Sequence, residues 1–229
     1  MTCFTSRLAA DRVIAVVRAP RIPDAAALCA ALLAGGIRWV ELTCTTPEVM
    51  DSLASAVAAD PGVRLGLGTV LTADQARAGI AAGAEYLVTP GCRAEVAQVA
   101  RAAGVPVLLG ALTPTEVARA ADLGAAAVKV FPARAFGPGY FKDLRGPYPD
   151  IPLIASGGVD AATAPAYLGH GALAVCAGGE VVPAAAVAAG DWPELTRRAK
   201  AFIASLDDAG PGPSRARQGL GAPEGPGAG

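Results

Sequence analysis

The sequence predicts an α/β protein built as a (β/α)8 TIM barrel. Short apolar runs alternate with amphipathic, alanine-rich stretches almost to the end of the chain, as in proteins whose parallel strands are joined by helices. Eight such pairs are present, and eight is the number of strands that closes this kind of barrel. The length of 229 residues suits a single barrel domain, and a hydrophobic content of 53% is enough for a large core.

The expected strands are the short apolar runs, and the expected helices are the amphipathic stretches between them. In chain order the strands are 13–18, 37–43, 63–68, 86–89, 105–109, 126–131, 152–155 and 172–176. The helices are 23–35, 47–59, 72–82, 92–103, 113–123, 139–144, 161–168 and 191–207. A further short helix at 2–10 is expected to cap the bottom of the barrel.

The residues at the helix ends support these assignments. Thr72 and Thr113 stand at N-cap positions, and Gln75 and Glu116 follow three residues later, as in a capping box. A glycine follows four of the helices, where a left-handed residue is expected to end the helix: Gly35, Gly83, Gly104 and Gly124.

An open, doubly wound sheet is the competing fold. Such a sheet normally carries a glycine-rich phosphate loop directly after its first strand. Here the first strand is followed by the segment APRIP at 19–23, which has no glycine. The barrel is therefore favoured, as one domain over residues 1–207.

Residues 208–229 are rich in glycine and proline without a repeat. Such a segment cannot bury enough apolar surface to offset the entropy of ordering it, so we expect a disordered tail.

Composition excludes several classes of partner and site. The net charge of −1 argues against nucleic acid and anionic membranes, which normally require a basic surface. The beginning of the chain shows no secretory signal, and there is no stretch of 18 uninterrupted apolar residues. Five scattered cysteines fit small buried residues in a reducing compartment. A cytoplasmic protein is expected. The single histidine, His170, precedes the last strand, so we expect a surface turn there and no metal site or cofactor.

Lys129 is the candidate nucleophile. It interrupts the apolar run at 125–132, near the carboxyl end of the sixth expected strand, whereas Lys142 and Lys200 lie in amphipathic stretches. An ammonium ion among alkyl groups is costly, so burial favours the free amine, which attacks carbonyl carbons. The alternative is a structural lysine paired with a buried carboxylate.

Glu41 provides a matching carboxylate. It lies in the strand at 37–43, and alternation along a strand places it on the same side as Trp39 and Thr43. If that side faces the barrel interior, Glu41 and Lys129 enter the same cavity from different strands. Glu41 then either neutralises Lys129 or transfers protons during catalysis.

A pair of glycines follows each of the last two strands: Gly157 with Gly158, and Gly178 with Gly179. In barrels the loops after strands 7 and 8 often hold a phosphate on main-chain N–H groups. The two pairs at these two positions favour anion binding there.

Together these segments resemble the 2-keto-3-deoxy-6-phosphogluconate/2-keto-4-hydroxyglutarate aldolases. The resemblance covers roughly residues 5–205, and its most specific element combines the strand around Glu41 with Lys-Val-Phe-Pro-Ala. The segments that carry it are 36–43, 66–70, 89–91, 128–133 and 156–158.

The resemblance implies a homotrimeric, metal-independent class I aldolase. Such an enzyme cleaves a 2-keto-3-deoxy sugar acid to pyruvate and an aldehyde. Lys129 would form the Schiff base, and Glu41 would transfer protons through a water molecule. The remaining substrate-binding residues implied are Thr69, Pro90 and Gly91 at the pyruvyl end, Phe131 beside it, Ser156 before the glycine loop, and the loop residues Gly157, Gly158, Gly178 and Gly179.

The chain departs from the family pattern at two positions. Thr45 stands where many members carry an arginine that binds the substrate carboxylate, and Arg18 is a candidate to replace that charge. Glu180 stands where a phosphate-binding serine is expected, and a carboxylate repels a phosphate. Glu180 then either points to solvent, is neutralised by Arg134, or indicates an unphosphorylated substrate.

Three functions stay open on the sequence. The leading one is an aldolase for 2-keto-3-deoxy-6-phosphogluconate, for an unphosphorylated analogue, or for 4-hydroxy-2-oxoglutarate. A phosphate-binding isomerase or epimerase would use Lys129 only as a cation and would form no covalent adduct. A barrel that has lost catalysis could bind a sugar acid as a sensor.

Overall fold

A computed structural model describes residues 3–207 of the chain, so the expected disordered tail at 208–229 lies outside the described residues. Eight parallel strands form a closed barrel in sequential order, which confirms the predicted fold and excludes the open sheet. The ring closes where β1 pairs with β8, with Val13 opposite Val175. The strands are β1 (Val13–Val17), β2 (Trp39–Thr43), β3 (Arg64–Gly68), β4 (Tyr86–Val88), β5 (Val107–Ala111), β6 (Ala127–Val130), β7 (Leu153–Ala155) and β8 (Ala174–Ala177).

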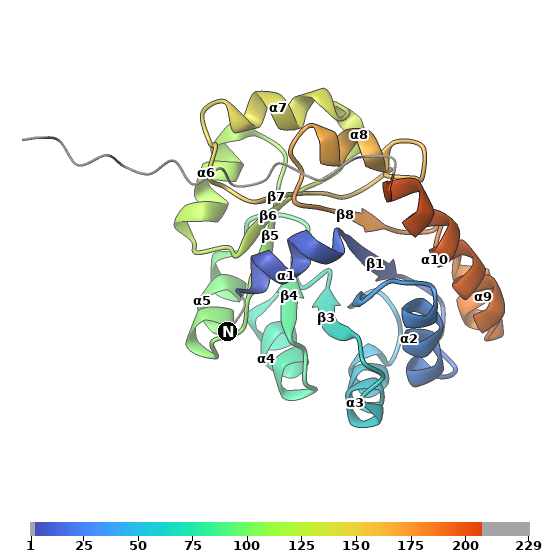
Figure 1. The fold of residues 1–229 in the computed structure, drawn as a ribbon. Coiled ribbons are helices and arrows are strands. Elements are labelled where there is room, and N and C mark those ends of the chain that lie inside the picture. Colours follow the sequence, from blue (N-terminus) through green and yellow to red (C-terminus); the bar gives the residue numbers. More distant parts are fainter. Residues whose placement is uncertain (1–2, 208–229) are drawn as a thin grey trace, which may run out of the picture.

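Helices surround the strands, and Figure 1 shows this ring with one helix, α1, lying across the end of the barrel. They are α1 (Phe4–Asp11), α2 (Ala25–Ala34), α3 (Val49–Ala59), α4 (Ala73–Ala81), α5 (Ala94–Ala102), α6 (Pro114–Asp122), η1 (Ala133–Ala135), α7 (Gly139–Arg145), α8 (Ala164–Gly169), α9 (Ala184–Ala189) and α10 (Trp192–Asp207). None of the helices within residues 3–207 is long and apolar enough to cross a membrane.

The helix α1 closes the amino-terminal end of the barrel, as predicted. Leu8 is fully buried and belongs to the cluster of side chains that fills the barrel interior. The Trp39 indole Nε1 donates a hydrogen bond to Asp11 Oδ2 at 2.7 Å, which ties α1 to the start of β2. The rings of Phe4 and Trp39 meet edge to face at 5.1 Å. This end of the barrel is therefore filled by side chains.

The predicted helix caps are largely confirmed. The Thr113 and Glu116 side chains form a complete capping box at the start of α6. The Thr72 hydroxyl accepts from the N–H of Gln75, while the Gln75 side chain accepts from the N–H of Leu71. Gly83, Gly104 and Gly124 have positive φ, as expected for residues that end helices.

The prediction for Gly35 is wrong by one residue. Gly35 keeps right-handed helical geometry with φ −84°, and Gly36 adopts the left-handed conformation with φ 93°. A side chain at Gly35 would overlap the Ala199 side chain, so Gly35 serves the close packing of α2 on α10.

Several other element boundaries differ from prediction. The fifth strand runs from Val107 to Ala111 instead of 105–109, because the N–H of Val105 is bonded to the Ala100 carbonyl, as part of the turn that ends α5. The helix α8 begins at Ala164 because Asp160 and Thr163 form a turn through their side chains. The short helices η1 and α9 were not predicted; both are alanine-rich stretches without a charged face to reveal them.

Candidate active site

Lys129 and Glu41 meet inside the barrel, as the alternation along the strands predicts. They project from β6 and β2, which lie on opposite sides of the eight-stranded ring. The Lys129 Nζ lies 3.8 Å from Glu41 Oε1, and the two residues are 6% and 0% exposed. Removing two opposite charges from water is costly, and such pairs often mark a functional site instead of stabilising a fold.

Two glycines of β3 make room for the groups beside this pair. A side chain at Gly68 would overlap Glu41 Oε1, and one at Gly66 would overlap the Tyr86 ring. Both glycines face the barrel interior, so the side chains from β2 and β4 lean over the strand between them. Glycine at 68 is therefore required for placing Glu41 where it meets Lys129, and glycine at 66 for placing the Tyr86 ring.

Three buried oxygen atoms of Glu41 and Tyr86 lack hydrogen-bond partners within residues 3–207, which is unusual for a protein interior. Among the residues that the structure describes, both Glu41 carboxylate oxygens and the Tyr86 hydroxyl are buried without a hydrogen-bond partner. Buried polar atoms are nearly always hydrogen-bonded, and exceptions concentrate at functional sites. Burial, and then the Glu41 charge, raise the pKa of the Tyr86 hydroxyl well above its ordinary value, so this phenol stays neutral. The Glu41 carboxylate is thus available to exchange a proton with Lys129 or with a bound molecule.

A cavity of about 450 Å³ opens above Lys129, at the carboxyl ends of the strands. In barrel enzymes this end carries the catalytic site. The Lys129 Nζ lies 5.5 Å from the centre of the Phe131 ring, which is partly exposed in the cavity. Nine of the predicted site residues line it: Arg18, Lys129, Phe131, Ser156, Gly157, Gly158, Gly178, Gly179 and Glu180.

The rest of the lining was missed on sequence. It consists of small or apolar side chains, which carry no chemical signal: Val16, Val159, Cys176, Val182 and Ala184. Alternation along β8 could have placed Cys176 inside the barrel. Burial raises the pKa of its thiol to about 11, against the opposing effect of the Lys129 charge, so Cys176 is a neutral wall of the cavity. The buried Cys29 and Cys176 fit the expectation for cysteines, whereas Cys3 is exposed.

Five predicted site residues are not in the cavity lining: Glu41, which is buried beside Lys129, and Thr45, Thr69, Pro90 and Gly91. Thr69 has a left-handed backbone (φ 55°) and its hydroxyl lies 3.4 Å from Arg18 Nη2. The Thr45 and Thr43 hydroxyls are 3.0 Å apart. Pro90 and Gly91 follow β4, and a side chain at Gly110, which pairs with Lys129, would overlap Pro90. Of these residues, Thr69 contacts a residue that lines the cavity, Arg18.

Glu180 is exposed to solvent, which is one of the alternatives expected for it. Its Oε2 also accepts a hydrogen bond of 2.8 Å from the N–H of Ala161, in the loop after β7. No ion pair with Arg134 forms within the described residues; the Arg134 side chain instead packs over Gly158. Arg198 holds the loop by donating to the main-chain carbonyl of Glu180 at 2.8 Å.

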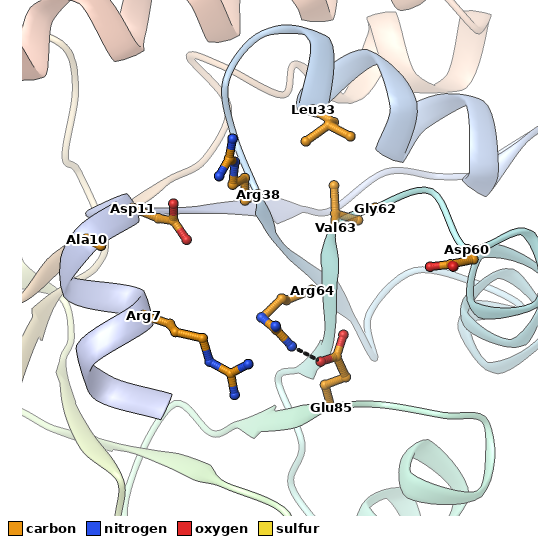
Figure 2. Close-up of a pocket in the computed structure, with 10 residues that line it drawn as sticks. All are labelled: Arg7, Ala10, Asp11, Leu33, Arg38, Asp60, Gly62, Val63, Arg64 and Glu85. Atoms are coloured by element: carbon orange, nitrogen blue, oxygen red, sulfur yellow. Dashed lines mark hydrogen bonds and ion pairs between the residues drawn. The ribbon is translucent and has the colours of Figure 1, made fainter. Parts of the chain in front are cut away.

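A larger cavity of about 700 Å³ lies at the opposite end of the barrel, beside α1 (Figure 2). Three arginines and three carboxylates line it: Arg7, Arg38 and Arg64 with Asp11, Asp60 and Glu85. Arg64 and Glu85 form an ion pair of 2.5 Å, drawn in Figure 2, and Asp11 is bonded to Trp39. Its charges are balanced and it holds no buried nucleophile, so the catalytic candidate is the cavity above Lys129.

The remaining charged candidates behave as surface residues. Lys142 and Lys200 are exposed, as predicted. His170 is exposed at the end of α8, where its Nδ1 lies 2.7 Å from the Ala166 carbonyl oxygen. None of them contributes to the cavity.

The sequence of this chain is similar to those of known aldolases. The family model for KDPG and KHG aldolase matches residues 4–198. The 2-dehydro-3-deoxy-phosphogluconate aldolase of Treponema pallidum is 37% identical over 186 residues, which cover 81% of this chain and 89% of that protein.

Solved structures give the same result. A KDPG aldolase from Legionella pneumophila, with pyruvate captured as a covalent carbinolamine intermediate, superposes with a TM-score of 0.81 and 29% identity, covering 88% of this chain and 98% of that one. A protein cage designed by fusing symmetric oligomeric domains superposes with a TM-score of 0.80 and 30% identity, covering 86% of this chain and 73% of that one. Because the match extends over nearly the whole barrel in sequence and in structure, this chain belongs to the KDPG and KHG aldolase family.

Proposed function

We propose that this chain is a lyase, a class I aldolase that reversibly cleaves a 2-keto-3-deoxy sugar acid to pyruvate and an aldehyde. Its substrate would be 2-keto-3-deoxy-6-phosphogluconate, which gives glyceraldehyde 3-phosphate, or 4-hydroxy-2-oxoglutarate, which gives glyoxylate; the alternative is an unphosphorylated 2-keto-3-deoxy acid. The observation that carries the proposal is the buried Lys129–Glu41 pair beneath an open cavity. The T. pallidum and L. pneumophila relatives, by their names, support the choice of substrate.

Lys129 begins the reaction as a nucleophile. Its neutral amine attacks the C2 ketone carbon, and the resulting carbinolamine loses water to become an iminium ion. Glu41, at 3.8 Å from the Lys129 Nζ, would accept the proton that the ammonium must lose and return a proton to the departing hydroxyl, directly or through a water molecule. Its buried, unpartnered oxygens suit this exchange.

The iminium ion then drives cleavage. A base removes the proton of the C4 hydroxyl, the C3–C4 bond breaks, and its electron pair moves toward the positively charged nitrogen to form an enamine. The aldehyde leaves, C3 takes up a proton, and water releases pyruvate and the free lysine. The iminium supplies the positive charge that a metal ion supplies in other enzymes. The proposed reaction therefore uses Lys129 and Glu41 and requires no metal ion.

Reductive trapping tests the proposal. The protein is incubated with pyruvate and sodium borohydride, and its mass is then measured by mass spectrometry. Lys129→Ala is treated in the same way, as is the control Lys200→Ala, which changes an exposed residue of α10. A reduced pyruvyl adduct is expected in the wild type and in Lys200→Ala, and not in Lys129→Ala. Circular dichroism checks that each variant is folded.

The absence of an adduct on folded wild-type protein would overturn the proposal and favour the isomerase or sensor. An adduct retained in Lys129→Ala would assign the chemistry to another amine.

We also propose a homotrimer that works in the cytoplasm. Family membership supports the trimer, and the similarity to a cage assembled from symmetric oligomeric domains supports an oligomeric state. Light scattering coupled to size-exclusion chromatography would give the mass of the assembly, and a monomer would contradict the proposal.

A further inference from the structure

The glycine-rich wall of the catalytic cavity carries a negative charge. Gly157, Gly158, Gly178 and Gly179 form this wall with Glu180. Among the described residues that line the cavity, the only charged ones are Arg18, Lys129 and Glu180. The Lys129 charge is balanced by Glu41 beneath it. A substrate bound to Lys129 at one end would therefore meet Glu180 at the other.

Glu180 is an exposed residue of the cavity lining, and one hydrogen bond joins its carboxylate to the loop after β7. Its Oε2 accepts from the N–H of Ala161 at 2.8 Å. The loops after the seventh and eighth strands of a barrel often bind the phosphate of a substrate with such main-chain N–H groups. Here one main-chain N–H of the loop after β7, that of Ala161, already binds an anion that belongs to the chain.

No cation offsets this charge within the described residues. Arg134 packs over Gly158 and makes no ion pair with Glu180. Arg198 contacts only the main-chain carbonyl of Glu180, and its Nε is bonded to Glu194 at 2.7 Å. A phosphate at this wall would face an unneutralised carboxylate, whereas a hydroxyl group could donate a hydrogen bond to it.

We infer that Glu180 determines substrate specificity at the end of the substrate far from Lys129, and that it favours an uncharged, hydroxylated end over a phosphorylated one. The inference rests on the proposed function. The preferred class of substrate is an unphosphorylated 2-keto-3-deoxy aldonate, with a terminal hydroxyl directed at Glu180. Phosphorylated acids bind against the repulsion of the same carboxylate.

The test compares kcat/KM for 2-keto-3-deoxy-6-phosphogluconate and for its unphosphorylated counterpart. Glu180→Gln removes the charge, and its amide oxygen can still accept from the N–H of Ala161. The ratio of kcat/KM, phosphorylated over unphosphorylated, is expected to rise at least tenfold, mainly through a lower KM for the phosphorylated acid. Inorganic phosphate should also become a stronger competitive inhibitor of Glu180→Gln.

Two matched variants separate charge from structure. Glu85→Gln removes one carboxylate at the opposite end of the barrel and should leave the ratio within twofold of the wild type. Glu180→Asp keeps the charge on a shorter side chain and should also keep a ratio close to that of the wild type.

A ratio in Glu180→Gln within twofold of the wild type, with unchanged inhibition by phosphate, would overturn the inference. If the pyruvyl adduct still forms on Lys129 in that case, the aldolase proposal stands and only the role of Glu180 falls. Without any adduct on the wild type, the aldolase proposal itself falls, and this inference falls with it.

Discussion

Arg18 is the residue most suited to bind the carboxylate of the substrate. It follows β1, lines the cavity together with Lys129, and its Nη2 lies 3.4 Å from the Thr69 hydroxyl. Thr45, where the family resemblance led us to expect an arginine, has no charge and contacts Thr43. A guanidinium group can bind a carboxylate through two parallel hydrogen bonds, so one well-placed arginine is sufficient.

At this scale we predict that Arg18→Ala raises the KM for pyruvate in the condensation direction by roughly 10-fold or more, because a hydrogen bond to a charged group contributes about 1.5–3 kcal/mol. The effect on kcat should be smaller, since the carboxylate is bound equally in the ground and transition states. Initial rates at varied pyruvate concentration measure both constants. Arg21→Ala, an exposed neighbour on the same loop, is the control and should leave KM unchanged.

At the scale of a whole element, the candidate active site depends on β3. This strand contributes space, because glycines stand where its side chains would enter the barrel interior. Gly66 and Gly68 alternate with the buried Leu65 and Leu67, so the strand packs outward against the helices and leaves the interior empty. Glu41 from β2 and Tyr86 from β4 occupy that interior space. The glycines allow a close approach that even alanine would prevent.

We predict that Gly68→Ala lowers kcat at least 100-fold, because the new methyl group displaces the Glu41 carboxylate and removes a general acid–base group. The extra atom in a packed interior should also destabilise the fold by about 1–3 kcal/mol. Gly139→Ala at the start of α7, where an added Cβ meets nothing within 4 Å, is the control for the substitution itself. Steady-state rates and thermal unfolding give both quantities. Wild-type kcat in Gly68→Ala would show that Glu41 has another place to sit.

For the whole molecule, stability should decrease in acid, because several carboxylates ionise more readily in the folded state. Hydrogen bonds from Arg197 and Arg198 lower the pKa of Glu194 from 4.5 to about 2. Hydrogen bonds from Thr113 and Leu112 lower that of Glu116, and hydrogen bonds from Thr163 lower that of Asp160. Where the folded pKa is below the unfolded one, the stabilisation is complete above the unfolded pKa and disappears as the pH falls through the folded pKa.

We therefore predict that the free energy of unfolding falls as the pH drops from 4.5 toward 2, measured by urea titration at a series of pH values. Glu194→Gln should reduce the slope of that fall, because a glutamine has no proton to gain. An unchanged slope in Glu194→Gln would show that the ion pairs on α10 do not contribute to stability in solution.

The helices and strands were predicted from local sequence patterns. These predictions were right where neighbouring residues alone decide the structure. The capping box at Thr113 and Glu116 is a contact between residues three apart, so the sequence contains all of it. The left-handed residue after α2 was misplaced by one position, because the packing of α10 on Gly35 decides which of two glycines turns the chain. The start of β5 was displaced for a similar reason, since Val105 is bonded to the end of α5.

The sequence by itself determined the barrel and singled out Lys129 and Glu41 as the candidate catalytic pair. Alternation of apolar runs and amphipathic stretches specifies the number and order of the strands, and an amine or a carboxylate in an apolar strand is costly enough to stand out. Only the tertiary structure decided that Lys129 and Glu41 lie 3.8 Å apart, because they come from strands on opposite sides of the ring. It alone placed Thr45 outside the cavity lining, put Cys176 in the wall, and directed the Glu180 carboxylate to the N–H of Ala161. The physical reason is that these contacts join residues far apart in the chain, whose separation depends on how the barrel closes and not on any local preference.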